Sequence, residues 1–310
     1  MTPEQITDLK KQRYNATVVR LSKLHSDLLT MRICPDYPLP PHDPGQYSTL
    51  GLGNWEPRHP GCQEELLAPE EESKLVRRAY SIGHPILDDQ GQLVDRTKIN
   101  WLEFYIVLVR ESDKAKPPAL TPRLFMLREG DRLFMGEKIA GHYTLDPVQP
   151  GDTVLFLSTG TGEAPHNYML WELLRRGHQG RILSACCVRY RRDLGYLPLH
   201  EELMRRYPSY TYLSLTTREA ATVQQKVYIQ DLIGSGQLEE RLGAPLDPAR
   251  THVYLCGNPN MIGMPTKDKQ SDQRVYPLPT GVVELLERRG FRIDQPAAKI
   301  IGNIHIEEYW

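Results

Sequence analysis

Residues 77–85, RRAYSIGHP, bring three chemically useful side chains close together. Arg78 suits a phosphate, Tyr80 suits packing on a flat ring, and Ser81 suits a short hydrogen bond. In a β-strand, Arg78 and Tyr80 would point to one face and Ser81 to the other, and Gly83 favours a turn after them. Alone, such residues more often form an ordinary amphipathic edge strand, so their chemistry depends on the rest of the chain.

A glycine-rich stretch, STGTGEAPHN, directly follows the apolar run TVLFLS. Gly160 and Gly162 permit a tight turn, and Pro165 suits the first turn of a helix. The N–H groups at such a helix start would favour a phosphate, although Glu163 would repel it. The stretch is neither a P-loop nor a complete G-x-G-x-x-G motif, so an ordinary strand-to-helix turn remains an alternative.

Arginines follow two further strand-like runs, in VRYRRDLGY and TTREAA. A site that prefers NAD often has an acid after the second strand, where this chain has Arg189, Arg191 and Arg192. Arg189 and Arg218 could clamp a 2′-phosphate, because guanidinium groups bind phosphate in a bidentate manner. The pattern therefore favours NADP over NAD, with solvated surface arginines as the alternative.

A cysteine ends another apolar run, THVYLC, and Gly257 follows it. The small polarizable side chain of Cys256 would leave room for a flat ligand beside the strand end, although many lone cysteines only pack in cores. The adjacent pair Cys186 and Cys187 lies inside a strand pattern, and we expect both to be core residues.

These residues require a scaffold of two parts. The first is typical of a small antiparallel barrel, with strand-like segments at 14–23, 28–33, 76–82, 101–110 and 132–136. After the linker-like DPVQPGD, apolar strands alternate with helical segments, which predicts a parallel sheet with helices on both faces. We predict domains over 12–146 and 151–310. Ligands of such sheets bind beyond the carboxyl ends of the strands, where the glycines, arginines and Cys256 are expected.

Composition excludes several classes of function. A net charge of −1 over 310 residues gives no general case for nucleic acid or an anionic membrane. The five cysteines form no C-x-x-C, and the ten histidines show no metal-ligand spacing, so we predict no metal site. Apolar runs are too short to span a bilayer and the start of the chain has no signal-peptide pattern, which predicts a cytoplasmic protein.

The order of the motifs resembles the bacterial flavodoxin/ferredoxin–NADP⁺ reductases. The stretches that carry the resemblance are RAYS, LEFYIV, LTPRL, TGTGEAP, RYRRDLGYLPL, TTREAA, CGNPNM and a terminal YW. The resemblance implies an N-terminal antiparallel FAD-binding β-barrel followed by a parallel-sheet α/β NADP-binding domain. It also implies hydride transfer from NADPH to flavin N5 and one-electron exchange with ferredoxin or flavodoxin.

The resemblance assigns an FAD site to the first motif. Arg78 would neutralise the flavin pyrophosphate, Tyr80 would pack on the isoalloxazine, and Ser81 would lie near N5. Thr161 would reach both cofactors. The other FAD contacts implied are Ala79, Tyr105, Ala119, Leu120, Thr121, Gly141, Thr144 and Trp310.

The resemblance likewise assigns an NADP site to the second domain. Arg189, Arg218 and Lys226 would hold the 2′-phosphate, and Cys256 would lie against the nicotinamide. The other NADP contacts implied are Gly160, Thr161, Gly162, Tyr190, Gly257, Asn258 and Pro259. Tyr309 and Trp310 would return to cover the flavin and would have to move for the nicotinamide. The implied catalytic residues are Ser81, Cys256 and Tyr309.

The expected partners are acidic electron carriers, and a basic rim would steer their encounter with a monomeric enzyme. The candidates for that rim, which could equally serve solubility, are Lys114, Lys116, Arg123 and Arg128. One alternative function is a reductase that serves an oxygenase or reduces free flavin or quinone, and another is a non-catalytic dinucleotide-binding redox sensor. The chain departs from the family pattern at Glu163, in an acidic insertion over 54–73, and in an expanded segment over 264–279.

Overall fold

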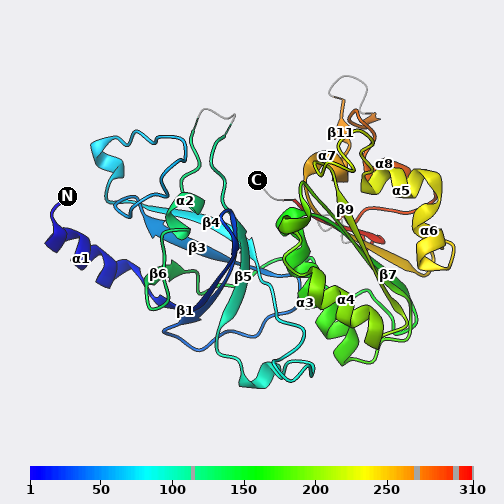
Figure 1. Cartoon of the computed structure of the whole chain (residues 1–310), viewed down its shortest axis with the longest axis horizontal. Coiled ribbons are helices and arrows are strands. Elements are labelled where there is room, and N and C mark those ends of the chain that lie inside the picture. The colour runs from blue at the N-terminus through cyan, green and yellow to red at the C-terminus, as the bar shows by residue number, and fades with distance from the viewer. Residues whose placement is uncertain (113–115, 269–272, 296–299, 309–310) are drawn as a thin grey trace. The chain divides into compact units, whose positions relative to one another are not determined.

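The chain divides into two compact units, Met1–Gly141 and His142–Trp310 (Figure 1). The computed structural model describes residues 1–112, 116–268, 273–295 and 300–308. Thr144, expected among the FAD contacts of the first domain, belongs to the second unit.

The first unit is built on six antiparallel strands in the order β4-β3-β6-β1-β2-β5. The strands are β1 (Ala16–His25), β2 (Leu28–Pro35), β3 (Tyr47–Gly53), β4 (Leu75–Ser81), β5 (Leu102–Val107) and β6 (Arg132–Met135). A bridge between Gly83 and Glu103 links the two ends of this order, so the sheet curls into a barrel. The predicted antiparallel barrel is confirmed.

Alternation along β2 shows why this sequence forms a barrel wall. Leu29, Met31 and Ile33 are fully buried, whereas Thr30 and Arg32 between them are half-buried. The short elements of the unit are α1 (Pro3–Arg13), α2 (Thr121–Leu124), η1 (Pro69–Glu71) and η2 (Arg96–Lys98). Helix α1 was not predicted, although Thr2 caps it through a complete capping box with Gln5.

The second unit contains a five-stranded parallel sheet in the order β13-β10-β7-β8-β9. The strands are β7 (Thr153–Thr159), β8 (Ile182–Val188), β9 (Tyr210–Thr216), β10 (Thr251–Gly257) and β13 (Ile304–Glu308). The helices are η3 (Gly160–Gly162), α3 (Glu163–Arg175), η4 (Arg191–Asp193), α4 (Leu197–Arg206), α5 (Ile229–Ser235), α6 (Gln237–Leu242), α7 (Pro259–Ile262) and α8 (Val282–Glu287). A small hairpin, β11 (Thr266–Lys267) with β12 (Arg274–Val275), occupies the expanded segment.

Helices cover both faces of this sheet, as predicted (Figure 1). On one face, Leu155 and Val253 share a core with Leu232 of α5 and Leu286 of α8. On the other face, the ring of Phe156 packs against His166 of α3. Cys186 and Cys187 are both buried within β8, as expected for core residues.

Two elements differ from the sequence-based expectation. The pattern of VYIQDLIGSGQLEERLG predicts one helix over 227–243, but the stretch forms two, α5 and α6, because Gly236 adopts a left-handed conformation with φ +79° between them. Strand β13 was not predicted, although the alternation of apolar and polar residues in IHIE was a usable signal. Among the described residues, no helix is long and apolar enough to cross a membrane, and no group of three or more His, Cys, Asp or Glu could hold a metal ion.

Candidate functional site

The segment RRAYSIGHP lies where the chain changes partner strands in the first unit. Ser81 ends β4 opposite Tyr47 of β3. Two residues later, the Gly83 N–H donates a 2.8 Å hydrogen bond to the Glu103 carbonyl of β5. The turn expected at Gly83 is therefore the point at which the barrel closes, and it holds Ser81 at a strand end.

The Ser81 hydroxyl is an orphaned polar group. Its residue is 5% exposed, and its Oγ has no hydrogen-bond partner among the described residues. Buried hydroxyls are almost always paired, so an orphaned one fits a ligand that supplies the partner. Tyr80 beside it is half-buried and meets Phe104 edge to face, whereas Arg78 and Ala79 are exposed. These environments fit the implied roles of phosphate binding, ring packing and a short hydrogen bond.

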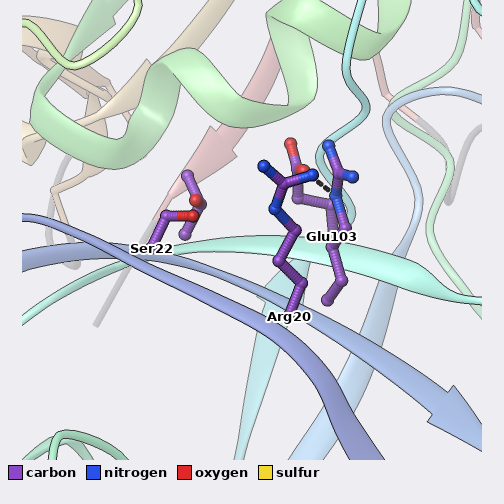
Figure 2. A pocket seen from close by; sticks show the side chains of 5 residues that line it. Arg20, Ser22 and Glu103 are labelled. Carbon is purple, nitrogen blue, oxygen red and sulfur yellow. Dashed lines mark hydrogen bonds and ion pairs between the residues drawn. The ribbon is translucent and has the colours of Figure 1, made fainter. Parts of the chain in front are cut away.

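An ion pair on β2 and β5 supports this strand end. Arg32 Nε donates to Glu103 Oε2 at 2.8 Å, and the Arg32 guanidinium lies 4.3 Å from the Trp101 ring centroid. Burial raises the pKa of Glu103, and the charge of Arg32 opposes that rise. Figure 2 shows Glu103 on the same side of the sheet as Arg20. Sequence reasoning missed this pair, although opposite charges at facing positions of two expected strands were a usable signal.

The other FAD candidates of the first unit lie on β5 and around α2. Tyr105 of β5 is 4% exposed. Leu120 is buried, Ala119 and Thr121 are half-buried, and Thr121 Oγ1 accepts a 3.1 Å hydrogen bond from the Val109 N–H. This hydrogen bond holds the Ala119–Thr121 turn against Val109, which lies just beyond the end of β5.

Gly141 is a position that only glycine suits. Its φ is +121°, and a Cβ there would lie 3.3 Å from the Tyr47 ring. Tyr309 and Trp310, the two residues expected to cover the flavin, lie outside the described residues.

The glycine turn of the second unit packs tightly against the end of β10. A Cβ on Gly162 would lie 2.3 Å from the Cys256 carbonyl oxygen, so only glycine permits this approach. On the other side, Gly257 has φ +129°, and the Asn258 N–H donates to Thr159 Oγ1 at 2.7 Å. The predicted gathering of the TGTG turn and the CGNPNM stretch is confirmed.

Space remains beside the first glycine of the turn. Gly160 has φ +54°, and a Cβ there would meet nothing within 4 Å. Thr161 is half-exposed, and Asn258 precedes the short helix α7 that begins at Pro259. The open side of Gly160 fits the close approach of a dinucleotide backbone.

Glu163 does not face that open space. Its carboxylate is 3% exposed, and Oε1 accepts a 2.6 Å hydrogen bond from the Tyr212 hydroxyl. His200 Nε2 lies 3.1 Å from the same oxygen, and the His200 ring stacks on Tyr212 with centroids 4.0 Å apart. Burial, reinforced by the charge of Glu163, raises the pKa of Tyr212 and of Cys186 well above their usual values. The carboxylate of Glu163 is therefore held inside a cluster with α4 and β9, and its repulsion of a pyrophosphate stays a prediction.

We expect Glu163→Ala to lower the free energy of unfolding by about 3 kcal/mol, because it removes the buried acceptor of the Tyr212 hydroxyl and the carboxylate that lies 3.1 Å from His200 Nε2. Glu163→Gln keeps one acceptor oxygen and should cost about 1 kcal/mol. Urea denaturation measures both, with the exposed Glu201→Gln on α4 as a control that should stay within about 0.5 kcal/mol of the parent. Equal losses for Glu163→Ala and the control would contradict this account of the cluster.

Cys256 is fully buried, and strand β13 places Glu307 opposite it in parallel register. Burial raises the pKa of the half-buried Glu307 from 4.5 to about 7. A carboxyl group that titrates near neutral pH beside the candidate nicotinamide position is suited to proton handling. Sequence reasoning missed Glu307, although an acid two residues before the aromatic tail was a usable signal.

This shift predicts a pH dependence. A carboxyl whose pKa is higher in the folded state stabilises the protein below its unfolded pKa, and the contribution is lost as pH rises from 4.5 to about 7. Relative to Glu307→Gln, the parent should lose about 1–3 kcal/mol of unfolding free energy between about pH 5 and about pH 8. Urea denaturation of both proteins at the two pH values gives this difference, and a pH-independent difference would contradict the shift.

Two arginines follow β8 and β9 side by side. The Arg218 N–H donates a 2.8 Å hydrogen bond to the Arg189 carbonyl, and both side chains are exposed. Neither makes an ion pair with any described residue, whereas Arg191 lies 3.8 Å from Glu201. Lys226 is also exposed, in the segment before α5. Two adjacent cations without counter-charges suit a dianionic phosphate.

The expected basic rim is only partly supported. Lys116 and Arg128 are exposed, and Lys114 lies outside the described residues. Arg123 is 1% exposed and forms an ion pair with Glu65, so its assignment to the rim is wrong.

Comparison with known proteins agrees with this arrangement. Residues 156–267 match the family described as Oxidoreductase NAD-binding domain. The flavodoxin/ferredoxin–NADP reductase of Shigella flexneri is 32% identical over 227 residues, which cover 73% of this chain and 77% of the relative.

Solved structures show the same fold. A ferredoxin NADP⁺ reductase from Neisseria gonorrhoeae with bound FAD and NADP matches with a TM-score of 0.67 at 18% identity, covering 96% of this chain and 98% of that one. A cytochrome P450 reductase from Amycolatopsis matches with a TM-score of 0.58 at 20% identity, covering 95% and 69%. With the sequence identity to the Shigella protein extending over both units, this chain belongs to the flavodoxin/ferredoxin–NADP reductase family.

Proposed function

We propose that this chain is an FAD-dependent oxidoreductase that exchanges electrons between NADP(H) and a one-electron carrier, ferredoxin or flavodoxin. The observation that carries the proposal is Ser81, whose buried hydroxyl lacks a partner at a strand end of a chain in this family. FAD, when bound, would accept hydride from NADPH and release electrons singly to the carrier.

The residues of the first unit would bind and orient FAD. Ser81 would donate a hydrogen bond from its hydroxyl to the flavin near N5, and Tyr80 would pack on the ring. Arg78, which is exposed, would face the pyrophosphate. Further contacts would come from Tyr105 and the Ala119–Thr121 turn. The position of Ser81 is fixed by the barrel closure at Gly83 rather than by the ligand.

The second unit would bind NADP(H) along the carboxyl ends of its strands. Gly160 and Gly162 would admit the pyrophosphate, and Arg189 with Arg218 would hold the 2′-phosphate. Cys256 is fully buried, so it would contact the nicotinamide only after the groups that cover its side chain have moved. Glu307 would hold or release a proton beside the nicotinamide.

Relatives named for both ferredoxin and flavodoxin support the assignment of an electron-carrier partner. Lys116 and Arg128 would contribute to the docking face. The likeness to a P450 reductase concerns the fold alone and does not favour the alternative of an oxygenase partner. A monomeric state and a cytoplasmic location stay predictions.

An acceptor comparison tests the proposal. The purified protein is supplied with NADPH and, in separate reactions, a bacterial ferredoxin, a flavodoxin, free FMN or a quinone, with cytochrome c as the final acceptor for the two carriers. We expect kcat/KM for a carrier to exceed that for free FMN and quinone by at least about tenfold, because docking orients the carrier. Comparable or better turnover with the small acceptors alone would favour the reductase of free flavin or quinone.

A further inference from the structure

The acidic insertion over residues 54–73 is fastened to the barrel rather than loosely exposed. It connects β3 to β4, and its first residues pack on the N-terminal segment. Tyr14 OH donates to Glu56 Oε1 at 2.7 Å, and Lys10 pairs with the same carboxylate at 2.9 Å. The Trp55 ring stacks on Tyr14 with centroids 6.1 Å apart. The first residues of the insertion are therefore held in place by the N-terminal segment.

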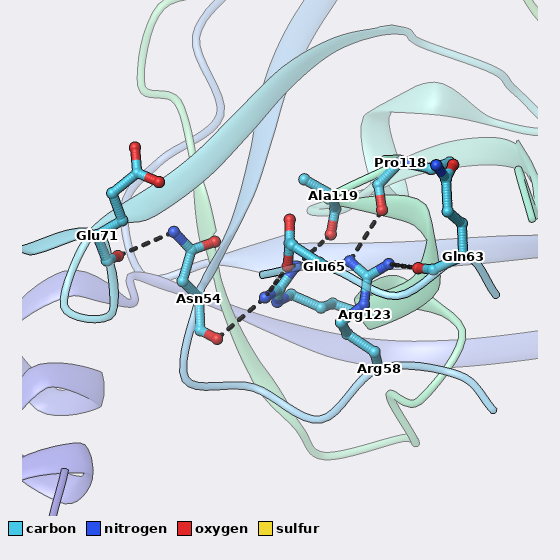
Figure 3. A network of polar contacts seen from close by, with 8 residues as sticks. All are labelled: Asn54, Arg58, Gln63, Glu65, Glu71, Pro118, Ala119 and Arg123. Atoms are coloured by element: carbon cyan, nitrogen blue, oxygen red, sulfur yellow. Dashed lines mark hydrogen bonds and ion pairs between the residues drawn. The ribbon is translucent and has the colours of Figure 1, made fainter. Parts of the chain in front are cut away.

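A buried ion triad lies at the centre of the insertion (Figure 3). Glu65 Oε2 accepts from Arg58 Nη1 at 3.0 Å and from Arg123 Nη2 at 2.6 Å. The Glu65 side chain is 8% exposed, and that of Arg123 is 1% exposed. A single carboxylate of the insertion thus lies between two cations, the buried Arg123 of α2 and Arg58 of the insertion itself.

The two guanidinium groups also hold the backbone just before α2 (Figure 3). Arg58 Nη1 donates to the Pro118 carbonyl at 2.9 Å, and Arg123 Nη1 donates to the Ala119 carbonyl at 2.6 Å. Arg123 Nη2 reaches the Asn54 carbonyl at 3.0 Å. Charge-assisted bonds to consecutive carbonyls fix the entry to the Ala119–Thr121 turn.

Backbone hydrogen bonds fasten the insertion on either side of that entry. The Gln63 N–H donates to the Arg110 carbonyl at 2.8 Å, and the Ser112 N–H donates to Gln63 Oε1 at 3.1 Å. The His59 N–H donates to the Pro122 carbonyl at 2.8 Å. The insertion is therefore bonded to the chain both before and after the Ala119–Thr121 turn.

We propose that the insertion is a clasp for FAD, in which Glu65 is a positioning residue that acts through Arg58 and Arg123 on the Ala119–Thr121 turn. This inference rests on the proposed function, which assigns that turn to FAD. Without the Glu65 carboxylate, two guanidinium groups would share a site that excludes most water, and their repulsion would displace the carbonyls that they hold. A turn held in its binding conformation before FAD arrives loses less conformational freedom on binding, so the clasp slows FAD release.

The test uses the FAD-loaded protein and measures the rate at which FAD fluorescence appears after dilution. Glu65→Gln should raise the dissociation rate constant by about tenfold or more, because the turn loses its preformed conformation. The neighbouring Glu64 is exposed, so Glu64→Gln removes the same charge from the insertion and should change the rate by less than about twofold. At saturating FAD, the rate constant for reduction of Glu64→Gln by NADPH should also stay within about twofold of the parent, because this exposed residue holds no part of the turn.

A second variant guards against failure of Glu65→Gln to fold. Arg58→Ala keeps the buried Glu65–Arg123 pair but removes the bond to the Pro118 carbonyl, and we expect about fivefold faster FAD release. The melting temperatures of the FAD-bound and FAD-free forms are compared for each variant, and the stabilisation by FAD should shrink in step with affinity.

The outcomes separate the two proposals. If the parent binds FAD and both clasp variants release it at the parental rate, the clasp is overturned while the proposed function stands. The clasp is also overturned if the variants melt earlier by the same amount with and without FAD, since the triad would then serve stability alone. A parent that binds no FAD would overturn the proposed function itself.

Discussion

Replacing both Arg189 and Arg218 with alanine is expected to lower kcat/KM for NADPH by about 10²–10³-fold and to leave that for NADH within about twofold. The two side chains are exposed, adjacent through a backbone hydrogen bond, and without ion-pair partners among the described residues. A 2′-phosphate is the chemical difference between the two cofactors, so two charge-assisted contacts to it would be lost only for NADPH.

Steady-state kinetics with a small acceptor at fixed ionic strength measures this ratio. Arg191→Ala is the matched control, because Arg191 lies in the same strand-end region but has Glu201 as a counter-charge 3.8 Å away. The control should change the ratio of NADPH to NADH efficiency by less than about threefold. Equal losses of kcat/KM for both cofactors in the double variant would show that the arginines support the fold. An unchanged kcat/KM for NADPH would show that the two arginines do not bind the 2′-phosphate.

The second large effect is expected for Ser81→Ala, which should slow reduction of bound flavin by NADPH about 100-fold while FAD content stays at the parental level. The Ser81 hydroxyl is buried and has no partner in the described part of the chain, so its hydrogen bond is available to a ligand at the strand end. Loss of a hydrogen bond that strengthens as charge moves onto the ring lowers the rate constant more than the affinity.

Stopped-flow absorbance under anaerobic conditions gives that rate constant directly. Ser48→Ala is the matched control, because Ser48 is a fully buried serine of β3 whose Oγ already donates to the Gly136 carbonyl at 3.3 Å. The control should cost some stability and leave the reduction rate within about twofold. Parental reduction rates in Ser81→Ala would contradict the proposed role of the hydroxyl.

The parts of the site that were predictable from sequence are those governed by local rules. A parallel sheet gathers ligand-binding residues at the carboxyl ends of its strands, and the TGTG turn, Arg189 and Cys256 all lie there. The glycines were readable because close approach and positive φ admit few other residues, as Gly162 and Gly257 show.

The missed features depend on contacts between distant parts of the sequence. Arg123 was expected on a rim, but its burial requires Glu65 from the insertion, which no local pattern reveals. The inward direction of Glu163 depends on His200 and Tyr212, which come from α4 and β9. The raised pKa of Glu307 comes from burial in β13, and that burial depends on the pairing of β13 with β10 from an earlier part of the chain.

The most direct test of the account is the visible absorption spectrum of the purified protein, recorded anaerobically before and after addition of NADPH and, separately, of NADH. The purified protein should be yellow, and its flavin band should bleach much faster with NADPH than with NADH. Equal rates of bleaching by both cofactors would contradict the proposal that Arg189 and Arg218 select the 2′-phosphate of NADPH. A protein that binds no flavin would contradict the proposed function altogether.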